Sequence, residues 1–229
     1  MKIVSVGCSF TSGVGVLANE TYTYQLSKLI NSDFHNWGEA GHSNQYIFRK
    51  TIELLKNWDK NDILIIQWTN PNRDEIVTNE GYLFYPPFSY WCSLSFLYGK
   101  DPIPDLQKIG ILDKDKFEKE IVEKNQSKVI EYSENFYNPE YQSTISFCFQ
   151  YALYGLLKHL NIKFIMFYGW EFEYYKKEIF SLTDANFVQE KFGVFVGTEH
   201  GEHPDASEHL KWAEFLYKKI IELNYTNLI

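Results

Sequence analysis

The stretch KIVSVGCSFTSG, residues 2–13, decides the fold of this chain. Residues 2–6 form a short apolar run that ends at glycine and small hydroxylic residues, which is typical of a buried strand followed by a tight turn into a helix. In an open α/β sheet, chemistry takes place at the carboxyl ends of the strands. Ser9 therefore occupies a position that suits a nucleophile, and a phosphate-binding or purely structural turn would have the same pattern.

Three other functional turns can be compared with this one. A Walker-type loop needs a lysine after its second glycine, and no lysine follows Gly13. The dinucleotide fingerprint needs G-x-G-x-x-G, but the glycines here are Gly7, Gly13 and Gly15. A phosphatase loop built on Cys8 would need an arginine in the same loop, whereas the first arginine of the chain is Arg49. A serine nucleophile remains, and it needs a base and an oxyanion hole from elsewhere in the chain.

Composition excludes several classes of protein. The chain has 229 residues, of which 45% are hydrophobic and 18% aromatic, enough for a substantial core. Its net charge is 22 − 30 = −8 and it has no basic block, so we expect no nucleic-acid partner. The three cysteines lack metal-ligand spacing, which favours reduced thiols. Because we find neither a signal peptide nor an apolar run that could span a bilayer, we expect a cytoplasmic protein; its oligomeric state is left open.

The spacing of apolar residues predicts alternating strands and helices. Short apolar runs predict buried strands, and spacings of three and four residues predict amphipathic helices. Strands are expected at 2–6, at the start of 34–44, at 62–68 and at 162–168, with a short edge strand at 192–196; helices are expected at 21–30, through 47–55, at 140–160 and after 205. Strands separated by helices form parallel sheets with right-handed crossovers. We therefore predict one α/β domain over residues 1–229, a three-layer α/β/α sandwich with a central parallel sheet.

Two helix starts can be read from capping residues. Ser43 or Asn44 is expected to cap the helix that runs through residues 47–55. Asp205, with Glu208 three residues later, has the pattern of a capping box for the last helix.

The regular pattern stops in the middle of the chain. Residues 74–113 are rich in aromatic residues and proline, and a charged segment follows. Long irregular segments in compact domains tend to be functional. We therefore expect an insertion or lid at about 74–140. Its aromatic side chains would suit stacking on sugar rings, and ordinary packing of a large loop would use the same residues.

The candidate site residues lie in four short sequence blocks, and the order of these blocks along the chain is informative. Gly7-Cys8-Ser9-Phe10, Asn36-x-Gly38-x-x-Gly41, Gln67-Trp68-Thr69-Asn70 and His203-Pro204 resemble the successive blocks of the SGNH (GDSL-like) hydrolase family. The resemblance implies a flavodoxin-like fold. It implies Ser9 as nucleophile, His203 as base, and an oxyanion hole made by Gly41 with Thr69 or Asn70. Residues of about 74–140 match none of these blocks.

The sequence departs from the family pattern at three places. Cys8 replaces the aspartate before the nucleophile, which removes no catalytic group. Strict alignment places Thr69 where the oxyanion asparagine belongs, with Asn70 one residue later. His200 occupies the position of the triad acid, so Glu202, or else Glu199, is expected to replace it, unless a backbone carbonyl leaves a Ser-His dyad. His209 is expected to be a helix residue packed near the site and not the base.

The resemblance implies acyl transfer through a Ser-His centre, without a metal or organic cofactor. The expected activity is hydrolysis of a small acyl ester, with O-acetyl groups on carbohydrate as the favoured substrate. An O-acyltransferase of the same fold and a catalytically silent glycan-binding or structural protein remain as alternatives.

Overall fold

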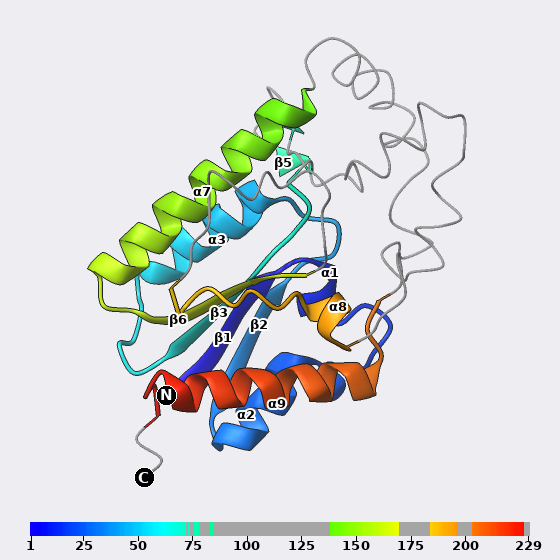
Figure 1. Ribbon diagram of the computed structural model, residues 1–229, viewed down its shortest axis with the longest axis vertical. Coiled ribbons are helices and arrows are strands. Elements are labelled where there is room, and N and C mark those ends of the chain that lie inside the picture. Colours follow the sequence, from blue (N-terminus) through cyan, green and yellow to red (C-terminus); the bar gives the residue numbers. More distant parts are fainter. Residues whose placement is uncertain are drawn as a thin grey trace.

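The structure of the protein, a computed structural model, describes residues 1–71, 73, 76–77, 83–84, 138–169, 184–196 and 203–226. Its main sheet has four parallel strands in the order β2-β1-β3-β6. These strands are β1 (Lys2–Gly7), β2 (Asp33–Gly38), β3 (Ile63–Trp68) and β6 (Lys163–Tyr168). Helices cover both faces (Figure 1), so the predicted three-layer α/β/α architecture with a central parallel sheet is confirmed.

The two faces of the sheet bury separate cores. One face packs against α2 (Tyr22–Ile30) and α9 (Ala206–Glu222), and the other packs against α3 (Asn44–Leu55) and α7 (Pro139–His159) (Figure 1). Ile63 and Ile65 of β3 belong to the first core, whereas Leu64, Ile66 and Trp68 belong to the second. Because successive side chains of a strand alternate between faces, this explains why β3 is an uninterrupted apolar run apart from Gln67.

Side-chain caps determine where the helices begin. Ser43 caps α3 by accepting a hydrogen bond of 3.3 Å from the Tyr46 amide. Asp205 and Glu208 form the predicted capping box of α9, in which each side chain accepts a hydrogen bond from the other residue's amide, at 2.9 and 2.7 Å. These caps hold the chain that precedes α3 and α9 at the carboxyl edge of the sheet, where the predicted site residues lie.

Residues Phe192–Val196 form a short helix, α8, and not the expected edge strand. The Gly193 amide donates a hydrogen bond of 2.7 Å to the Gly169 carbonyl just after β6, which turns the segment back towards the sheet. Phe192 is then fully buried, with its ring stacked on Trp212 at 5.1 Å. A run of five residues has too few turns for its periodicity to distinguish a helix from a strand. Here the contacts of Phe192 with Trp212 and of Gly193 with Gly169 favour the helix.

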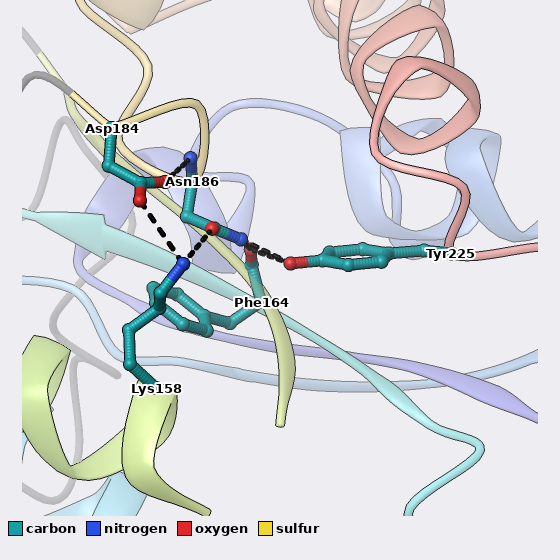
Figure 2. Close-up of polar contacts among 5 residues, drawn as sticks. All are labelled: Lys158, Phe164, Asp184, Asn186 and Tyr225. Carbon is teal, nitrogen blue, oxygen red and sulfur yellow. Dashed lines mark hydrogen bonds and ion pairs between the residues drawn. The ribbon is translucent and has the colours of Figure 1, made fainter. Parts of the chain in front are cut away.

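The free edge of β6 is instead extended by residues around Phe187, which forms a parallel bridge with Met166. Figure 2 shows the polar cluster that holds this segment. The side-chain amide of Asn186 donates to the Phe164 carbonyl at 2.8 Å and to the Tyr225 hydroxyl, and Lys158 Nζ donates to Asn186 Oδ1 at 3.2 Å. Lys158 also pairs with Asp184 at 3.1 Å. The cluster joins the end of α7, the edge of the sheet and the C-terminal segment.

The remaining described elements are short. They are α1 (Ser9–Ser12), the 3₁₀ turn η1 (Ala18–Glu20), and β4 (Ile76–Val77), which pairs antiparallel with β5 (Leu83–Phe84). Apart from β4, β5 and the start of α7, the expected insertion or lid at about 74–140 lies outside the described residues. None of the helices described here combines the length and the apolarity that crossing a membrane requires.

Candidate functional site

Ser9 is the first residue of α1 and lies directly beyond the carboxyl end of β1, one of the two inner strands of the sheet. Its side chain is almost fully buried, with 3% of the residue exposed. The amides of Gly13 and Val14 donate to the Ser9 carbonyl at 3.0 and 3.1 Å, which closes the short helix. Gly13 has φ +77°, a left-handed conformation that suits glycine. The sequence therefore presents Ser9 on a tight, closed turn at the carboxyl edge of the sheet.

A buried chain of polar side chains lies beneath this turn. The Tyr22 hydroxyl contacts Thr11 Oγ1 at 2.9 Å, and Thr11 Oγ1 donates to Gln67 Oε1 at 2.6 Å. Gln67 Nε2 donates to Cys8 Sγ at 3.1 Å, and Cys8 Sγ lies 3.9 Å from Ser9 Oγ. All five residues are at least 97% buried. Sequence analysis did not identify these hydrogen-bonded side chains. The glutamine within the apolar run of β3 was the available signal, because a buried glutamine needs a polar partner.

The direction of donation at the Tyr22 end of these contacts follows from the number of protons. A threonine hydroxyl carries one proton, and Thr11 gives it to Gln67, so Tyr22 must donate to Thr11. Cys8 Sγ accepts from Gln67, and between Cys8 Sγ and Ser9 Oγ either atom can be the donor. When the Cys8 thiol donates, the Ser9 hydroxyl proton remains for a base.

His203 lies next to the Ser9 turn, two residues before the cap of α9. Its ring packs edge-on against Phe10, the neighbour of Ser9, with 5.4 Å between ring centroids. Among the described residues no hydrogen bond joins His203 to Ser9, so their pairing stays a prediction. Burial, together with the charge of Arg73, lowers the pKa of His203 to about 4, which leaves the ring neutral and able to accept a proton at neutral pH. The predicted acid Glu202, Glu199 and His200 all lie outside the described residues.

The end of β2 packs tightly against the same turn. Asn36 donates to the Thr11 carbonyl at 2.6 Å and accepts from the Gly38 amide at 2.9 Å. A Cβ on Gly38 would lie 2.2 Å from the Ser12 amide nitrogen, so only glycine fits here. Gly41 follows with φ +80°, and within the described part of the chain its amide has no hydrogen-bond partner.

Thr69 and Asn70 differ in their surroundings. Thr69 is fully buried, and its hydroxyl has no hydrogen-bond partner within the described residues. Its backbone is held by Asn44, which accepts from the Thr69 amide at 2.8 Å and donates to the Thr69 carbonyl at 3.0 Å. Asn70 is only partly buried, and its carbonyl accepts from the Arg73 amide at 3.1 Å.

Arg73 brings a positive charge to this edge of the sheet. The residue is only 7% exposed, and its Nη1 donates to the His42 carbonyl at 3.4 Å, beside Gly41. Burial is the main cause that lowers the pKa of His42 to about 4, with Arg73 and Arg49 lowering it further. The same guanidinium acts on His203, so Arg73 influences both the predicted base and the Gly41 loop. Sequence reasoning did not identify Arg73.

His209 is fully buried on α9 and packs as the sequence analysis expected. Its Nδ1 accepts a hydrogen bond of 3.1 Å from the Tyr22 amide at the start of α2, and its ring is stacked on that of Tyr22 at 6.0 Å. Burial lowers its pKa to about 4, since the opposing effect of Asp205 is smaller. His209 thus joins α9 to α2.

The described contacts link all four predicted blocks around the Ser9 turn. The second block is bonded to Thr11, the third reaches Cys8 through Gln67, and the fourth packs on Phe10 through His203. In the part of the chain that is described, no three His, Cys, Asp or Glu side chains are grouped so that they could hold a metal ion.

Comparison with known proteins identifies similar folds only. No family model and no curated protein sequence matches the chain. Three solved structures are similar over nearly their whole length: a lipolytic protein of the G-D-S-L family from Veillonella parvula DSM 2008 (16% identity, 97% of both chains, TM-score 0.36), a putative one from Desulfitobacterium hafniense DCB-2 (15%, 95% of this chain and 98% of that one, 0.38), and TesA (12%, 97% and 99%, 0.40). Similarities of this size do not establish the family or the activity of this chain.

Proposed function

We propose that this protein is a serine ester hydrolase in which Ser9 is the nucleophile and His203 the general base. The observation that carries the proposal is the position of His203 against Phe10, beside a buried serine that begins a helix at the carboxyl end of β1. A nucleophilic serine needs a neutral base close by, and burial keeps the pKa of His203 at about 4. In the proposed arrangement the Cys8 thiol donates to Ser9 Oγ, which leaves the Ser9 proton available to that base.

In the proposed reaction His203 accepts the Ser9 proton while Ser9 Oγ attacks the carbonyl carbon of an ester. The carbonyl oxygen becomes an oxyanion that is stabilised by the amides of Ser9 and Gly41 and by a side chain after β3. His203 then gives its proton to the leaving alkoxide, and an acyl-enzyme remains. Water, activated by the same histidine, releases the acid and restores the Ser9 hydroxyl.

Thr69 is the better side-chain donor to the oxyanion than Asn70. Side chains alternate along a strand, and Gln67, two residues before Thr69, faces the Ser9 turn through Cys8. If the alternation of β3 continues for one residue, Thr69 faces the same side and Asn70 the opposite one. The Thr69 hydroxyl is buried and has no hydrogen-bond partner among the described residues, so it can donate to the oxyanion.

The partner of the second ring nitrogen of His203 belongs to the proposal as well. Glu202 is proposed to supply the carboxylate that orients the ring, with Glu199 or a backbone carbonyl as the alternative. A carboxylate there would raise the pKa of His203 and stabilise the imidazolium that forms during attack. The Glu202→Gln and Glu199→Gln variants distinguish the cases, because loss of the partner lowers both the rate and the apparent pKa, whereas a dyad is unaffected by either change.

The proposed substrate is a small acyl ester, with O-acetyl groups on carbohydrate as the favoured class. The support for this class is the resemblance of the four sequence blocks and the aromatic-rich segment of about 74–140. An O-acyltransferase would use the same first half-reaction and a sugar hydroxyl in place of water. Incubating the protein and an acetyl donor with and without a sugar acceptor separates the two, since only a transferase forms acetylated sugar.

The test of the proposed function is hydrolysis of p-nitrophenyl acetate by the parent protein, Ser9→Ala and Ser207→Ala. Ser207 is an exposed serine of α9, so it serves as a matched control. We expect Ser9→Ala to lower kcat by at least about 1,000-fold and Ser207→Ala to leave it unchanged. Equal turnover by the parent and Ser9→Ala would support the silent glycan-binding or structural alternative instead.

A further inference from the structure

Beyond the end of β3, the side chain of Asn44 makes the backbone hydrogen bonds that a neighbouring strand would otherwise make. β1 ends at Gly7 and turns into α1, so it offers no backbone partner to Thr69. Asn44 Oδ1 accepts from the Thr69 amide at 2.8 Å and Asn44 Nδ2 donates to the Thr69 carbonyl at 3.0 Å, so one primary amide satisfies both backbone groups of Thr69. On the other side, the Gly169 amide after β6 donates to the Trp68 carbonyl at 3.0 Å. Together they hold the chain after β3 from both edges.

This arrangement fixes the direction of the Thr69 side chain. Asn44 and Thr69 are both fully buried, so water does not compete for the two hydrogen bonds. With its amide and carbonyl both held, the backbone of Thr69 is fixed, and with it the direction in which Cβ leaves the backbone. The Thr69 hydroxyl is buried and has no hydrogen-bond partner among the described residues. Leaving a buried polar group without a hydrogen bond is costly, and a ligand atom that completes the bond would remove that cost.

Asn44 also links Thr69 to the other proposed donor. It is the first residue of α3, only three residues after Gly41, and Ser43 between them caps the helix. Arg73 forms a second link, since it follows Thr69 in the chain and donates to the His42 carbonyl at 3.4 Å. The segment that contains Gly41 and the segment that contains Thr69 are therefore joined by the buried bonds of Asn44 and by the longer, partly buried bond of Arg73.

We infer that Asn44 is a positioning residue of the oxyanion hole, which holds Thr69 Oγ1 in register with the Gly41 amide. The inference rests on the proposed function, and it concerns a residue that touches neither the substrate nor the nucleophile in that proposal. It predicts that Asn44 contributes to kcat through Thr69 alone. A residue that only stabilises the fold would instead lower the activity of every variant by the same factor.

The experiment is a double-mutant cycle on p-nitrophenyl acetate hydrolysis with Asn44→Ala, Thr69→Val and the double variant. We expect Thr69→Val to lower kcat by about 100-fold, the usual effect of removing one oxyanion donor, and Asn44→Ala by about 10- to 100-fold, with KM little changed in both. In the double variant, Asn44→Ala should add less than about threefold, because its target hydroxyl is already gone.

A matched control shows what a purely structural asparagine does. Asn186 is also a buried asparagine that donates to a backbone carbonyl, but its partner Phe164 lies near the amino end of β6 (Figure 2). Asn186→Ala should lower the unfolding temperature and leave kcat unchanged. Asn44→Ser provides a second variant, whose side chain is too short to hold both backbone groups of Thr69 but which adds no buried charge and suits a helix start, so it should fold even if Asn44→Ala does not.

The outcomes separate the inference from the function it depends on. Non-additive losses in Asn44 and Thr69 variants support the positioning role. An unchanged kcat in Asn44→Ser and Asn44→Ala, or losses that multiply in full in the double variant, overturn the positioning role while Ser9-dependent turnover of the parent still supports the hydrolase. Absence of Ser9-dependent turnover in the parent overturns both.

Discussion

Gln67 Nε2 of β3 donates a hydrogen bond to Cys8 Sγ at 3.1 Å, immediately before the proposed nucleophile. The same side chain accepts from Thr11 at 2.6 Å, so one glutamine holds both ends of the turn that contains Ser9. It is fully buried, and β3 is otherwise apolar. Gln67 thus links β3 to both ends of the turn that contains Ser9.

Gln67→Leu should therefore destabilise the protein by about 1–3 kcal/mol, because it leaves the Thr11 hydroxyl buried without its acceptor. Ser9-dependent esterase activity should fall as well, since the turn loses its support. Urea unfolding and p-nitrophenyl acetate hydrolysis measure the two effects. Gln25→Leu, which removes an exposed hydrogen bond to the Asn19 carbonyl, is the control and should change neither. Equal stability of the two variants would contradict the supporting role of Gln67.

Gly38→Ala should damage the site by steric conflict. The new Cβ would lie 2.2 Å from the backbone nitrogen of Ser12, and backbone cannot move away cheaply. We expect a loss of about 1–3 kcal/mol of stability and a lower kcat, because overpacking displaces the turn. Gly155→Ala on α7 is the matched control: a Cβ there has nothing within 4 Å, so it should stabilise the protein by about 1 kcal/mol. If Gly38→Ala changed neither the stability nor kcat, the backbone at Ser12 would be able to move away from the new Cβ at little cost, contrary to the prediction.

The activity should persist in acid. Neutral His203 is the proposed base, and burial together with Arg73 lowers its pKa to about 4. As pH falls through about 4 the ring is protonated and loses its capacity to accept the Ser9 proton, so kcat/KM should be halved near pH 4 and constant above about pH 5. The pH–rate profile of the free enzyme measures this. The proposed Glu202 carboxylate would raise this midpoint, and Glu202→Gln should then return it to about 4. A midpoint near 6.5, the ordinary histidine value, that Glu202→Gln leaves unchanged would contradict the burial of His203.

Removal of the Arg73 charge should raise the pKa of His203. The guanidinium disfavours the imidazolium, so Arg73→Gln should move the acid limb of kcat/KM to higher pH, and the charge-retaining Arg73→Lys should move it less. Histidine resonances followed by NMR during a pH titration report the shift directly, and His42 should shift in the same direction. Identical titrations of His203 in Arg73→Gln and the parent would contradict the electrostatic coupling.

Stability should also depend on pH between about 6.5 and 4. Three partly or fully buried histidines, His42, His203 and His209, have pKa values of about 4 in the folded protein, below the unfolded value of 6.5. The unfolded chain thus binds more protons over this interval, so stability is fully present above about pH 6.5 and is lost as pH falls towards 4. His209→Gln should reduce the slope of unfolding free energy against pH by about a third, whereas His35→Gln, which removes an exposed histidine, should retain most of it. Equal slopes for the parent and His209→Gln would contradict the burial argument.

Much of the architecture follows from local patterns in the sequence. The apolar runs of β1, β3 and β6, the amphipathic helices between them, and the caps at Ser43 and Asp205 depend on residues close together in the chain, so periodicity and capping chemistry were sufficient. Local patterns failed at Phe192–Val196, where an apolar run too short for its period to be read forms α8 because of its contacts with Gly169 and Trp212. The predicted domain limits and the insertion or lid stay predictions.

The sequence by itself determined which residues stand at the ends of strands and before the last helix, and hence the candidates Ser9, Gly41, Thr69, Asn70 and His203. Only the tertiary structure decided how these segments are joined. The bonds of Gln67 to Cys8 and of Asn44 to Thr69 connect residues 59 and 25 positions apart, and the contact of Phe10 with His203 spans most of the chain. No local periodicity encodes such pairs, because they arise where parallel strands end at one edge of the sheet and buried polar groups must find partners there.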